Sequence, residues 1–383
     1  MLTTPAGKHG RHDSYRQDNS RGRLLAMAVS TGKKLVYSLV AVVLVAAAVE
    51  VVLRCVYFQV KATSPLAVQT TIEMFKDRAG RQAATDVIER FKDTRQPTWR
   101  AFFGEQGRDL REQFERQYEQ EFIRLVDACR KIDSTLVVLY LPSTDPESPD
   151  HCSEAPSRTF FERITGEQGV PLVDLTAAIR EHSWQDVTLL PEDDHFSRLG
   201  NRVVASQLSE LLGSLRENRC NVTYNGTPVV CADLKPGRST QWELHSRLPF
   251  LVTTNAQGFR GEQDVEVPSK RQRILLLGDS YTFGVHLPNA HTFAAMLAHH
   301  EPGLEVLNAG VVGYTIAQEV ELFQERAAAV APDVTVLQVL DNDIYGMFFF
   351  TRSWFDRKGR QYEASGAERA FLEELGLGEL SDW

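Results

Sequence analysis

The chain has 383 residues, of which 43% are hydrophobic and 24% are charged, and its formal net charge is −9 at pH 7. This length and composition allow a full-sized hydrophobic core and favour a globular protein. The negative charge gives no general attraction to nucleic-acid phosphates, so nucleic acid is not expected as a partner.

The N-terminal part of the sequence predicts a membrane anchor. Basic residues are frequent in the leader, residues 1–34, and the uncharged apolar run Leu35 to Val49 follows it. With the apolar residues that continue this run, the segment 35–58 reaches the roughly 20 residues that a bilayer requires. The basic leader predicts a cytoplasmic N-terminus and an extracytoplasmic remainder. A cleaved signal peptide and a buried core helix are the alternatives.

The 5 cysteines show no metal-binding spacing. None lies in a CxxC motif or at a zinc-finger distance from histidines, so no zinc site is expected. One interpretation pairs Cys220 with Cys231 and Cys129 with Cys152 in an oxidising compartment, and the other leaves them as free thiols.

The region after the anchor predicts helices that alternate with buried strands. Residues 59–111 are interpreted as a charged helical spacer, and apolar residues recur at helical spacing through Arg111 to Cys129. The runs Thr135 to Leu141 and Pro171 to Leu175 are short and apolar enough for strands that are buried on both faces. A helical piece at 160–166 lies between them. This alternation predicts a parallel α/β sheet.

A segment of different composition leads to a second α/β block. Residues 217–270 are rich in Cys, Gly, Pro and Thr and are interpreted as a connector, in which Asn221 and Asn225 open N-x-S/T sequons. Strands and helices then alternate again, at Arg273 to Leu277, Thr292 to His299, Leu304 to Leu307, Ala317 to Val330 and Val334 to Val339.

Polar motifs follow the strands of this second block. Gly278-Asp279-Ser280 comes directly after the first strand. Reacting groups gather at the carboxyl ends of parallel strands, so Ser280 stands where a nucleophile is expected. Gly313 and Asn342 follow the two later strands, where a glycine N–H and an asparagine amide can stabilise an oxyanion. Each motif alone also fits an ordinary helix cap or turn.

A candidate general base lies earlier in the chain. His195 stands among the carboxylates Glu192, Asp193 and Asp194. A histidine that a carboxylate orients can accept the proton of a serine nucleophile. The alternative is a surface loop in which Ser197 caps the following helix and His195 has no chemical role.

Together these motifs resemble the sequence blocks of the SGNH or GDSL hydrolases. Gly278-Asp279-Ser280 resembles the nucleophile block of that family, and Gly313 resembles its glycine block. Asn342 resembles the asparagine block and His195 the histidine block. The stretch Asn255 to Gly261 is also similar to a segment of membrane-anchored bacterial members. The resemblance implies a three-layer α/β/α fold with a flavodoxin-like five-stranded sheet.

The resemblance also implies a role for each motif. Ser280 would attack an acyl carbon, His195 would transfer its proton, and Asp193 would orient His195. The N–H groups of Ser280 and Gly313 and the side-chain amide of Asn342 would hold the oxyanion. This chemistry requires neither a metal nor an organic cofactor.

The histidine block departs from the family pattern in its carboxylate. Glu192 stands three residues before His195, where the usual residue is aspartate. Asp193 is therefore assigned as the partner of His195, as in members that read D-x-H, and Glu192 and Asp194 stay open as alternatives.

The order of the blocks departs further, because His195 precedes Ser280. We therefore expect a circularly permuted domain, in which residues 112–216 form the half with the histidine block and residues 271–383 form the half with the other blocks. Residues 217–270 would connect the former ends. Two incomplete halves completed by another chain, or an inactive product, are the alternatives.

The expected function is ester hydrolysis on an acylated glycan or lipid outside the cytoplasm, with O-acetyl esters first among the substrates. An O-acyltransferase of envelope polysaccharide and a non-catalytic glycan-binding envelope protein are the alternatives. Aromatic residues near the strand ends are interpreted either as an acyl pocket or as core. They are Tyr281, Phe283, Tyr314, Tyr345 and Phe348 to Phe350.

Overall fold

The computed structural model describes residues 97–142, 154–190, 193–215, 230–242, 250–267, 269–353 and 364–377. The expected anchor at 35–58 lies outside these residues, as do the leader and most of the spacer. Among the described residues, no helix combines the length and the apolar composition that a membrane crossing requires.

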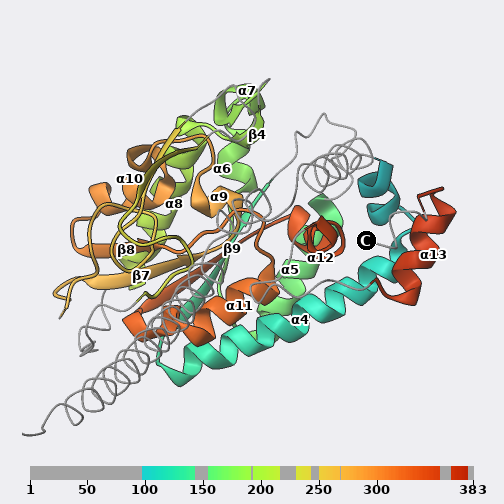
Figure 1. Ribbon diagram of the computed structural model, residues 1–383, viewed down its shortest axis with the longest axis horizontal. Coiled ribbons are helices and arrows are strands. Elements are labelled where there is room, and N and C mark those ends of the chain that lie inside the picture. The colour runs from blue at the N-terminus through green and yellow to red at the C-terminus, as the bar shows by residue number, and fades with distance from the viewer. Residues whose placement is uncertain are drawn as a thin grey trace, which may run out of the picture. The chain divides into compact units, whose positions relative to one another are not determined.

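A parallel sheet of five strands forms the centre of the fold, in the order β2-β1-β9-β7-β8. Figure 1 labels three of these strands, β9, β7 and β8. The register joins Thr135 of the first strand to Val334 of the last. Segments from both sides of the connector therefore share one sheet, which confirms the predicted α/β class. The strands are β1 (Thr135–Leu141), β2 (Leu172–Asp174), β7 (Gln272–Leu277), β8 (Leu304–Asn308) and β9 (Val334–Leu340).

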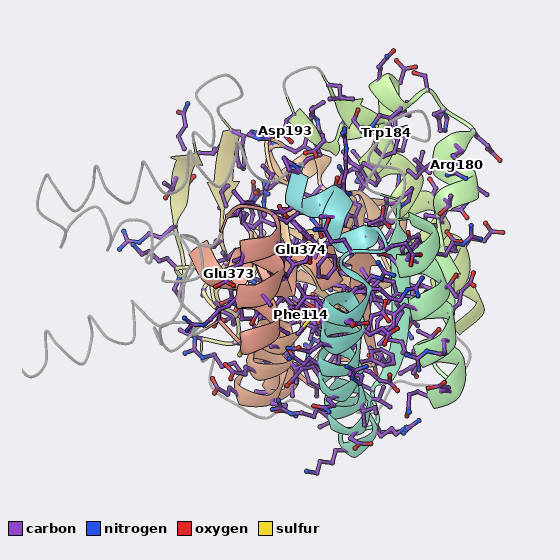
Figure 2. All side chains as sticks on the ribbon, turned by 90° about the vertical axis from the view of Figure 1, so that its right-hand side faces the viewer. Phe114, Arg180, Trp184, Asp193, Glu373 and Glu374 are labelled. Atoms are coloured by element: carbon purple, nitrogen blue, oxygen red, sulfur yellow. The ribbon has the colours of Figure 1, made fainter. Side chains whose placement is uncertain are left out.

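Helices cover both faces of this sheet, because its central strands are apolar on both sides. Alternate residues of a strand point to opposite faces, so Leu275 and Ile274 of β7 enter two different hydrophobic clusters. Phe114 of α4 lies in the first cluster (Figure 2). That face is covered by α4 (Arg108–Lys131), α5 (Glu154–Gln168) and α11 (Ile316–Glu325), and the other by α8 (Arg198–Leu215) and α10 (Phe293–His300).

The strand order has the pattern of a flavodoxin-like fold when the strands are counted from β7. The sequence β7, β8, β9, β1, β2 then gives the spatial order 2-1-3-4-5. In such sheets the strand order reverses between the first and third strands, which are β7 and β9 here, and ligands bind at the carboxyl ends beside that point.

Several elements differ from those expected. The helix predicted for Ala317 to Val330 is two helices, α11 and the 3-10 helix η3 (Ala327–Val330), and Asn342 begins a helix that was not predicted. The connector contains a β-hairpin. The other elements are α6 (Thr176–Arg180), α7 (Trp184–Val187), β3 (Thr188–Leu189), β4 (Asp193–Phe196), β5 (Ser239–Trp242), β6 (Phe250–Thr253), α9 (Ser280–Phe283), η2 (Asn289–His291), α12 (Asn342–Ser353) and α13 (Gly366–Glu374).

The aromatic residues near the strand ends belong to the core. Phe283, Tyr345 and Phe348 are fully buried, and Tyr281 and Tyr314 are buried as well. The ring of Tyr345 lies 4.8 Å from that of Trp99, in an aromatic group that joins α12 to residues 97–103. The core interpretation therefore holds for these five aromatic residues, and the side chains of 349–350 lie outside the description.

Cys129 is a buried free thiol, so the free-thiol interpretation holds at this position. Cys152 and Cys220, which the disulfide interpretation paired with Cys129 and Cys231, lie outside the described residues.

Candidate active site

The turn after β7 places Ser280 at the carboxyl end of the sheet, as the first residue of α9. Gly278 has a φ of +153°, and a Cβ at this position would lie 2.3 Å from Oγ1 of Thr282. Only glycine suits such a turn. Asp279 caps α9, because its carboxylate accepts a hydrogen bond from the backbone N–H of Tyr281 at 3.0 Å. The hydroxyl of Ser280 therefore lies where the strand order reverses.

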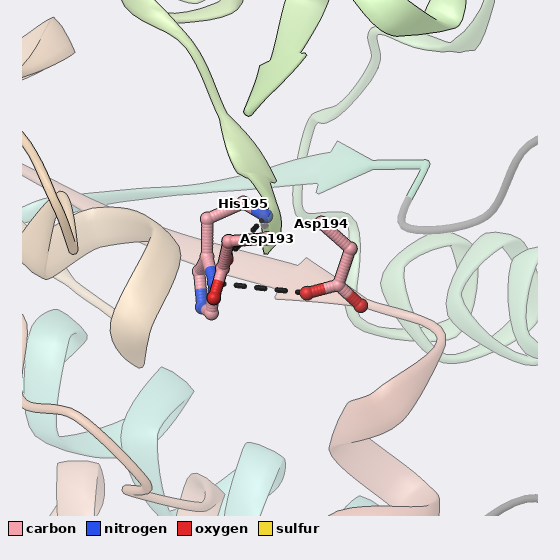
Figure 3. Close-up of side chains that lie close together, drawn as sticks. All are labelled: Asp193, Asp194 and His195. Carbon is pink, nitrogen blue, oxygen red and sulfur yellow. Dashed lines mark hydrogen bonds and ion pairs between the residues drawn. The ribbon is translucent and has the colours of Figure 1, made fainter. Parts of the chain in front are cut away.

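His195 on β4 contacts this serine. Its Nε2 atom lies 2.7 Å from Oγ of Ser280. On the opposite side of the ring, Nδ1 contacts Oδ1 of Asp193, which also accepts a hydrogen bond from the backbone N–H of His195 at 2.9 Å (Figure 3). The Asp194 carboxylate is 53% exposed and lies 3.7 Å from Nδ1. Asp193 thus makes the closer contact, and Glu192 lies outside the described residues.

The electrostatics of this group favour an ionised Asp193 beside a basic histidine. Burial by itself would lower the pKa of His195, but the hydrogen bond and the charge of Asp193 outweigh burial and raise that pKa above its ordinary value. Burial likewise opposes ionisation of Asp193, but hydrogen bonds from His195 and His286 hold the pKa of its carboxyl well below the usual range. Asp193 can therefore stabilise a protonated His195.

The raised pKa of His195 predicts how a reaction that uses His195 as its base depends on pH. His195 accepts a proton only in its neutral form, so kcat/KM is expected to fall as the pH drops through this pKa. The ordinary histidine value is 6.5, and the acid limb is therefore expected to have its midpoint above 6.5. Hydrolysis of p-nitrophenyl acetate followed from about pH 5 to pH 9 measures that midpoint. A midpoint below the ordinary value would contradict the described contacts.

A second histidine, which the sequence analysis did not single out, contacts the same carboxylate. Nε2 of His286 lies 3.1 Å from Oδ2 of Asp193, and the side chain of His286 is only 1% exposed. Its one signal in the sequence is its place shortly after Ser280, which puts it at the same edge of the sheet. Tyr281, which the sequence analysis interpreted only as acyl pocket or core, also contacts this segment: its hydroxyl donates to the carbonyl oxygen of Asp194 at 3.2 Å.

Gly313 and Asn342 follow the strands on either side of β7, because β8 and β9 are both neighbours of β7. Their positions therefore lie at the same end of the sheet as Ser280. Gly313 has a φ of +76°, and Asn342 begins α12. In the described part of the chain, the N–H groups of Ser280 and Gly313 and the side-chain amide of Asn342 donate to no protein group. No described protein acceptor therefore occupies these three donors, as the oxyanion role expected from the sequence requires.

The loop after β8 is attached to the nucleophile turn. The side-chain amide of Asn308 donates to the carbonyl oxygen of Thr282 at 2.7 Å. Gly310 packs so closely on the turn that a Cβ at this position would lie 2.4 Å from the backbone nitrogen of Phe283. These contacts join the loop that carries Gly313 to the turn that carries Ser280.

Arg260 supports the other end of the turn. It donates to the carbonyl oxygen of Gly284 at 2.8 Å and also contacts those of Phe283 and Leu287. The guanidinium lies 4.5 Å from the centre of the Phe283 ring, and burial lowers its pKa to about 9. The stretch Asn255 to Gly261, noted in the sequence, thus helps to hold the nucleophile turn, although it lies in the predicted connector.

Three buried carboxyl groups accompany the site residues: Asp279, Glu319 and Asp343. Burial raises the pKa of each, and repulsion by Asp343 and Asp279 raises the pKa of Glu319 further. Among the described residues, Oε1 of Glu319 has no hydrogen-bond partner. The protonated form of Glu319 is therefore favoured in the folded protein.

Replacing Glu319 with glutamine is expected to stabilise the protein at neutral pH. The unfolded chain ionises Glu319 near its ordinary pKa of 4.5, whereas the folded chain resists ionisation. The free energy of unfolding therefore decreases as the pH rises from 4.5 toward the pKa that Glu319 has in the folded protein. Glutamine does not ionise, so the variant does not show this decrease. Each pKa unit corresponds to about 1.4 kcal/mol, and each kcal/mol to roughly 2–4 °C in Tm.

Thermal unfolding of Glu319→Gln beside wild type, at about pH 5 and pH 8, tests this expectation. The exposed Glu325 of the same helix provides the control variant, Glu325→Gln. A gain in Tm for Glu319→Gln that is the same at both pH values would contradict the expected protonation of Glu319 in the folded protein.

Asp193, Asp194 and His195 also form a candidate metal cluster among the described residues, with ligand atoms within 4.8 Å of one another. The ring nitrogens of His195 already contact Asp193 and Ser280, however, and the second oxygen of Asp193 contacts His286. These contacts suit proton transfer, because they leave His195 no nitrogen to offer a metal ion.

No protein-family model and no curated protein matches the chain. Among solved structures, the O-acetyltransferase domain of Pseudomonas putida AlgJ is 18% identical over 61% of this chain and 84% of that chain, with a TM-score of 0.38. Pseudomonas aeruginosa AlgX is 15% identical over 62% of this chain and 59% of that chain, with a TM-score of 0.34. The chemistry of the site therefore has to follow from its own residues.

Proposed function

We propose that this chain is a serine acyl-transfer enzyme of the SGNH type, which cleaves acyl esters, above all O-acetyl esters, of an extracytoplasmic glycan or lipid. The observation that carries the proposal is the series of contacts from Ser280 through His195 to Asp193, with 2.7 Å between the serine oxygen and the histidine nitrogen. This distance lies within the roughly 2.6–3.2 Å that proton transfer requires.

In the first half of the reaction, Oγ of Ser280 attacks the ester carbonyl carbon, and its proton passes to Nε2 of His195. The N–H groups of Ser280 and Gly313 and the amide of Asn342 hold the negative charge that develops on the carbonyl oxygen. The C–O bond of the ester then breaks, and His195 returns the proton to the leaving alcohol. The acyl group remains on Ser280, while Asp193 stabilises the imidazolium that forms on the way.

The second acceptor decides between the two candidate enzyme activities. Water, deprotonated by His195, releases the acid and regenerates Ser280, which makes the protein a hydrolase. A hydroxyl group of an envelope polysaccharide takes the acyl group instead and makes it an O-acyltransferase. A non-catalytic glycan-binding protein would have no need to keep the histidine nitrogen within hydrogen-bond distance of the serine oxygen, which favours the enzyme.

We infer that the domain is circularly permuted, with residues 271–383 as the first half, residues 112–216 as the second and residues 217–270 as the connector. The strand order supports this inference, because it is flavodoxin-like when counted from β7. The apolar run Leu35 to Val49 after a basic leader, and its mostly apolar continuation to residue 58 with Glu50 and Arg54, support a membrane anchor with the site outside the cytoplasm.

Covalent labelling with a fluorophosphonate probe tests the proposed chemistry. The purified full-length chain is expected to be labelled at Ser280, and labelling is expected to be lost in Ser280→Ala and strongly reduced in His195→Ala. Ser239→Ala, which removes an exposed hydroxyl on β5, is the matched control and should label like wild type. A correctly folded wild type that the probe does not label would overturn the proposal. Acetate release from an acetylated glycan, measured with and without a sugar acceptor, then separates hydrolase from transferase.

A further inference from the structure

The carboxylate of Asp193 is contacted at both of its oxygens. Oδ1 contacts Nδ1 and the backbone N–H of His195, whereas Oδ2 lies 3.1 Å from Nε2 of His286. An ionised carboxylate can only accept hydrogen bonds, so Nε2 of His286 must carry a hydrogen and donate it. The two histidines thus bind one carboxylate from two sides.

The backbone of His286 is unusual for its residue type. Its φ is +62°, in the left-handed region that few residues with a side chain adopt. This conformation costs free energy, and such strain collects at functional sites when the surrounding contacts compensate for it. The ring of His286 packs 5.5 Å from the ring of Phe250 on β6 and 6.2 Å from the ring of His195. Packing and the charge-assisted hydrogen bond to Asp193 therefore help to hold His286 in this conformation.

We propose that His286 is a positioning residue, which fixes the plane of the Asp193 carboxylate so that Oδ1 stays aligned with His195. The proposal rests on the proposed serine chemistry, because alignment matters only where His195 moves a proton. A carboxylate held at Oδ1 alone can rotate about its Cβ–Cγ bond, whereas a second hydrogen bond at Oδ2 prevents rotation. The depressed pKa of Asp193 agrees with donation from both histidines.

The contact also links the connector to the reaction. Phe250 belongs to the hairpin β5–β6, and its ring lies 6.5 Å from that of Phe283 in the nucleophile turn. The connector therefore covers the far side of His286, while β4 supplies Asp193 on the near side. Correct placement of the carboxylate depends on three separate segments of the chain.

Variants of the full-length chain separate the hydrogen bond of His286 from its packing. His286→Phe keeps a ring against Phe250 but removes the donor. His286→Gln restores an N–H at about the same distance along the side chain. His286→Asn accepts the left-handed backbone, but its amide is too short to reach Asp193. His182→Phe, at an exposed histidine, is the matched control.

Kinetics of p-nitrophenyl acetate hydrolysis and of fluorophosphonate labelling provide the first readout. We expect His286→Phe and His286→Asn to lower kcat and the labelling rate about 10- to 100-fold with KM unchanged. His286→Gln is expected to recover most of the rate. Equal rates in wild type and His286→Phe would overturn the proposal, and so would an equal loss in His286→Gln and His286→Phe. If His286→Phe does not fold, the comparison of His286→Asn with His286→Gln decides.

A second readout does not depend on activity. The proton between Nδ1 of His195 and Asp193 should give a far-downfield resonance in the proton NMR spectrum. We expect this resonance in wild type and His286→Gln and its loss by exchange in folded His286→Phe. If wild type fails to react with the probe but the resonance depends on His286 in this way, the proposed function fails while the positioning role stands. An unchanged resonance in His286→Phe would overturn the positioning role.

Discussion

Replacing Asp193 with asparagine is expected to lower kcat about 10³- to 10⁴-fold while the fold stays intact. Asparagine has nearly the same shape, but its NH₂ group can donate a hydrogen bond toward Nδ1 of His195. The neutral histidine would then carry its hydrogen on Nε2, the atom that has to accept the proton of Ser280. The variant would therefore keep the shape of the site, but His195 could no longer accept the proton of Ser280.

The same variant is expected to shift the pH dependence. The hydrogen bond and charge of Asp193 raise the pKa of His195, so their removal lowers that pKa and moves the acid limb of kcat/KM to lower pH. Asp194→Asn is the matched control, because this exposed carboxylate lies farther from His195. Measurement of kcat/KM against pH tests the expected shift, and circular dichroism checks that both variants are folded. Equal losses in the two variants would contradict the assignment of Asp193.

Replacing Gly310 with alanine is expected to destabilise the protein by about 3 kcal/mol, at the upper end of the range for overpacked sites. The new Cβ would lie 2.4 Å from the backbone nitrogen of Phe283 and 2.7 Å from the backbone carbonyl carbon of Thr282. Backbone atoms cannot rotate away as side chains can. The loop after β8 and the nucleophile turn would have to separate, which also displaces Ser280 from His195.

Gly303→Ala provides a matched control, because it makes the same change at the opposite end of β8, where a Cβ would meet nothing within 4 Å. Urea unfolding of both variants beside wild type measures the difference in free energy of unfolding. Gly310→Ala should also label more slowly with the fluorophosphonate probe. Equal stability of the two variants would show that the loop and the turn are not packed as described.

The central strands could be predicted closely from the sequence because they are buried on both faces. The runs expected at Thr135 to Leu141 and Val334 to Val339 match β1 and β9 to within one residue. Such strands read as continuous apolar runs and need no knowledge of their neighbours. The start of α12 at Asn342 was missed, because Asp341, Asn342 and Asp343 are typical of a loop. In the structure Asp343 instead accepts a hydrogen bond from the backbone N–H of Leu340.

The sequence analysis named those residues of the candidate site that lie in short motifs directly after strands, such as Ser280 and Asn342. The choice among the three carboxylates near His195 stayed open because residues 193–196 were not expected to be a strand. Alternate residues of a strand point to the same face, which puts Asp193 beside His195, whereas the Asp194 carboxylate is exposed and lies farther from Nδ1, at 3.7 Å. His286 left no local pattern, because its partner Asp193 lies in a distant segment. Arg260 belongs to a stretch that was noted for its resemblance, but its contact with the nucleophile turn could not be predicted from that stretch.

The pairing of β1 with β9 affects how the chain folds while it is being synthesised. The hydroxyl of Tyr140 at the end of β1 donates to Asp341, which is 201 residues later. At roughly 5–20 residues per second, a ribosome needs about 10–40 s to cover that interval. Until then the edge of β1 that pairs with β9 has no neighbouring strand, and the sheet cannot close. During this interval the nascent segment that carries His195 can be bound by chaperones or cleaved by proteases before its sheet is complete.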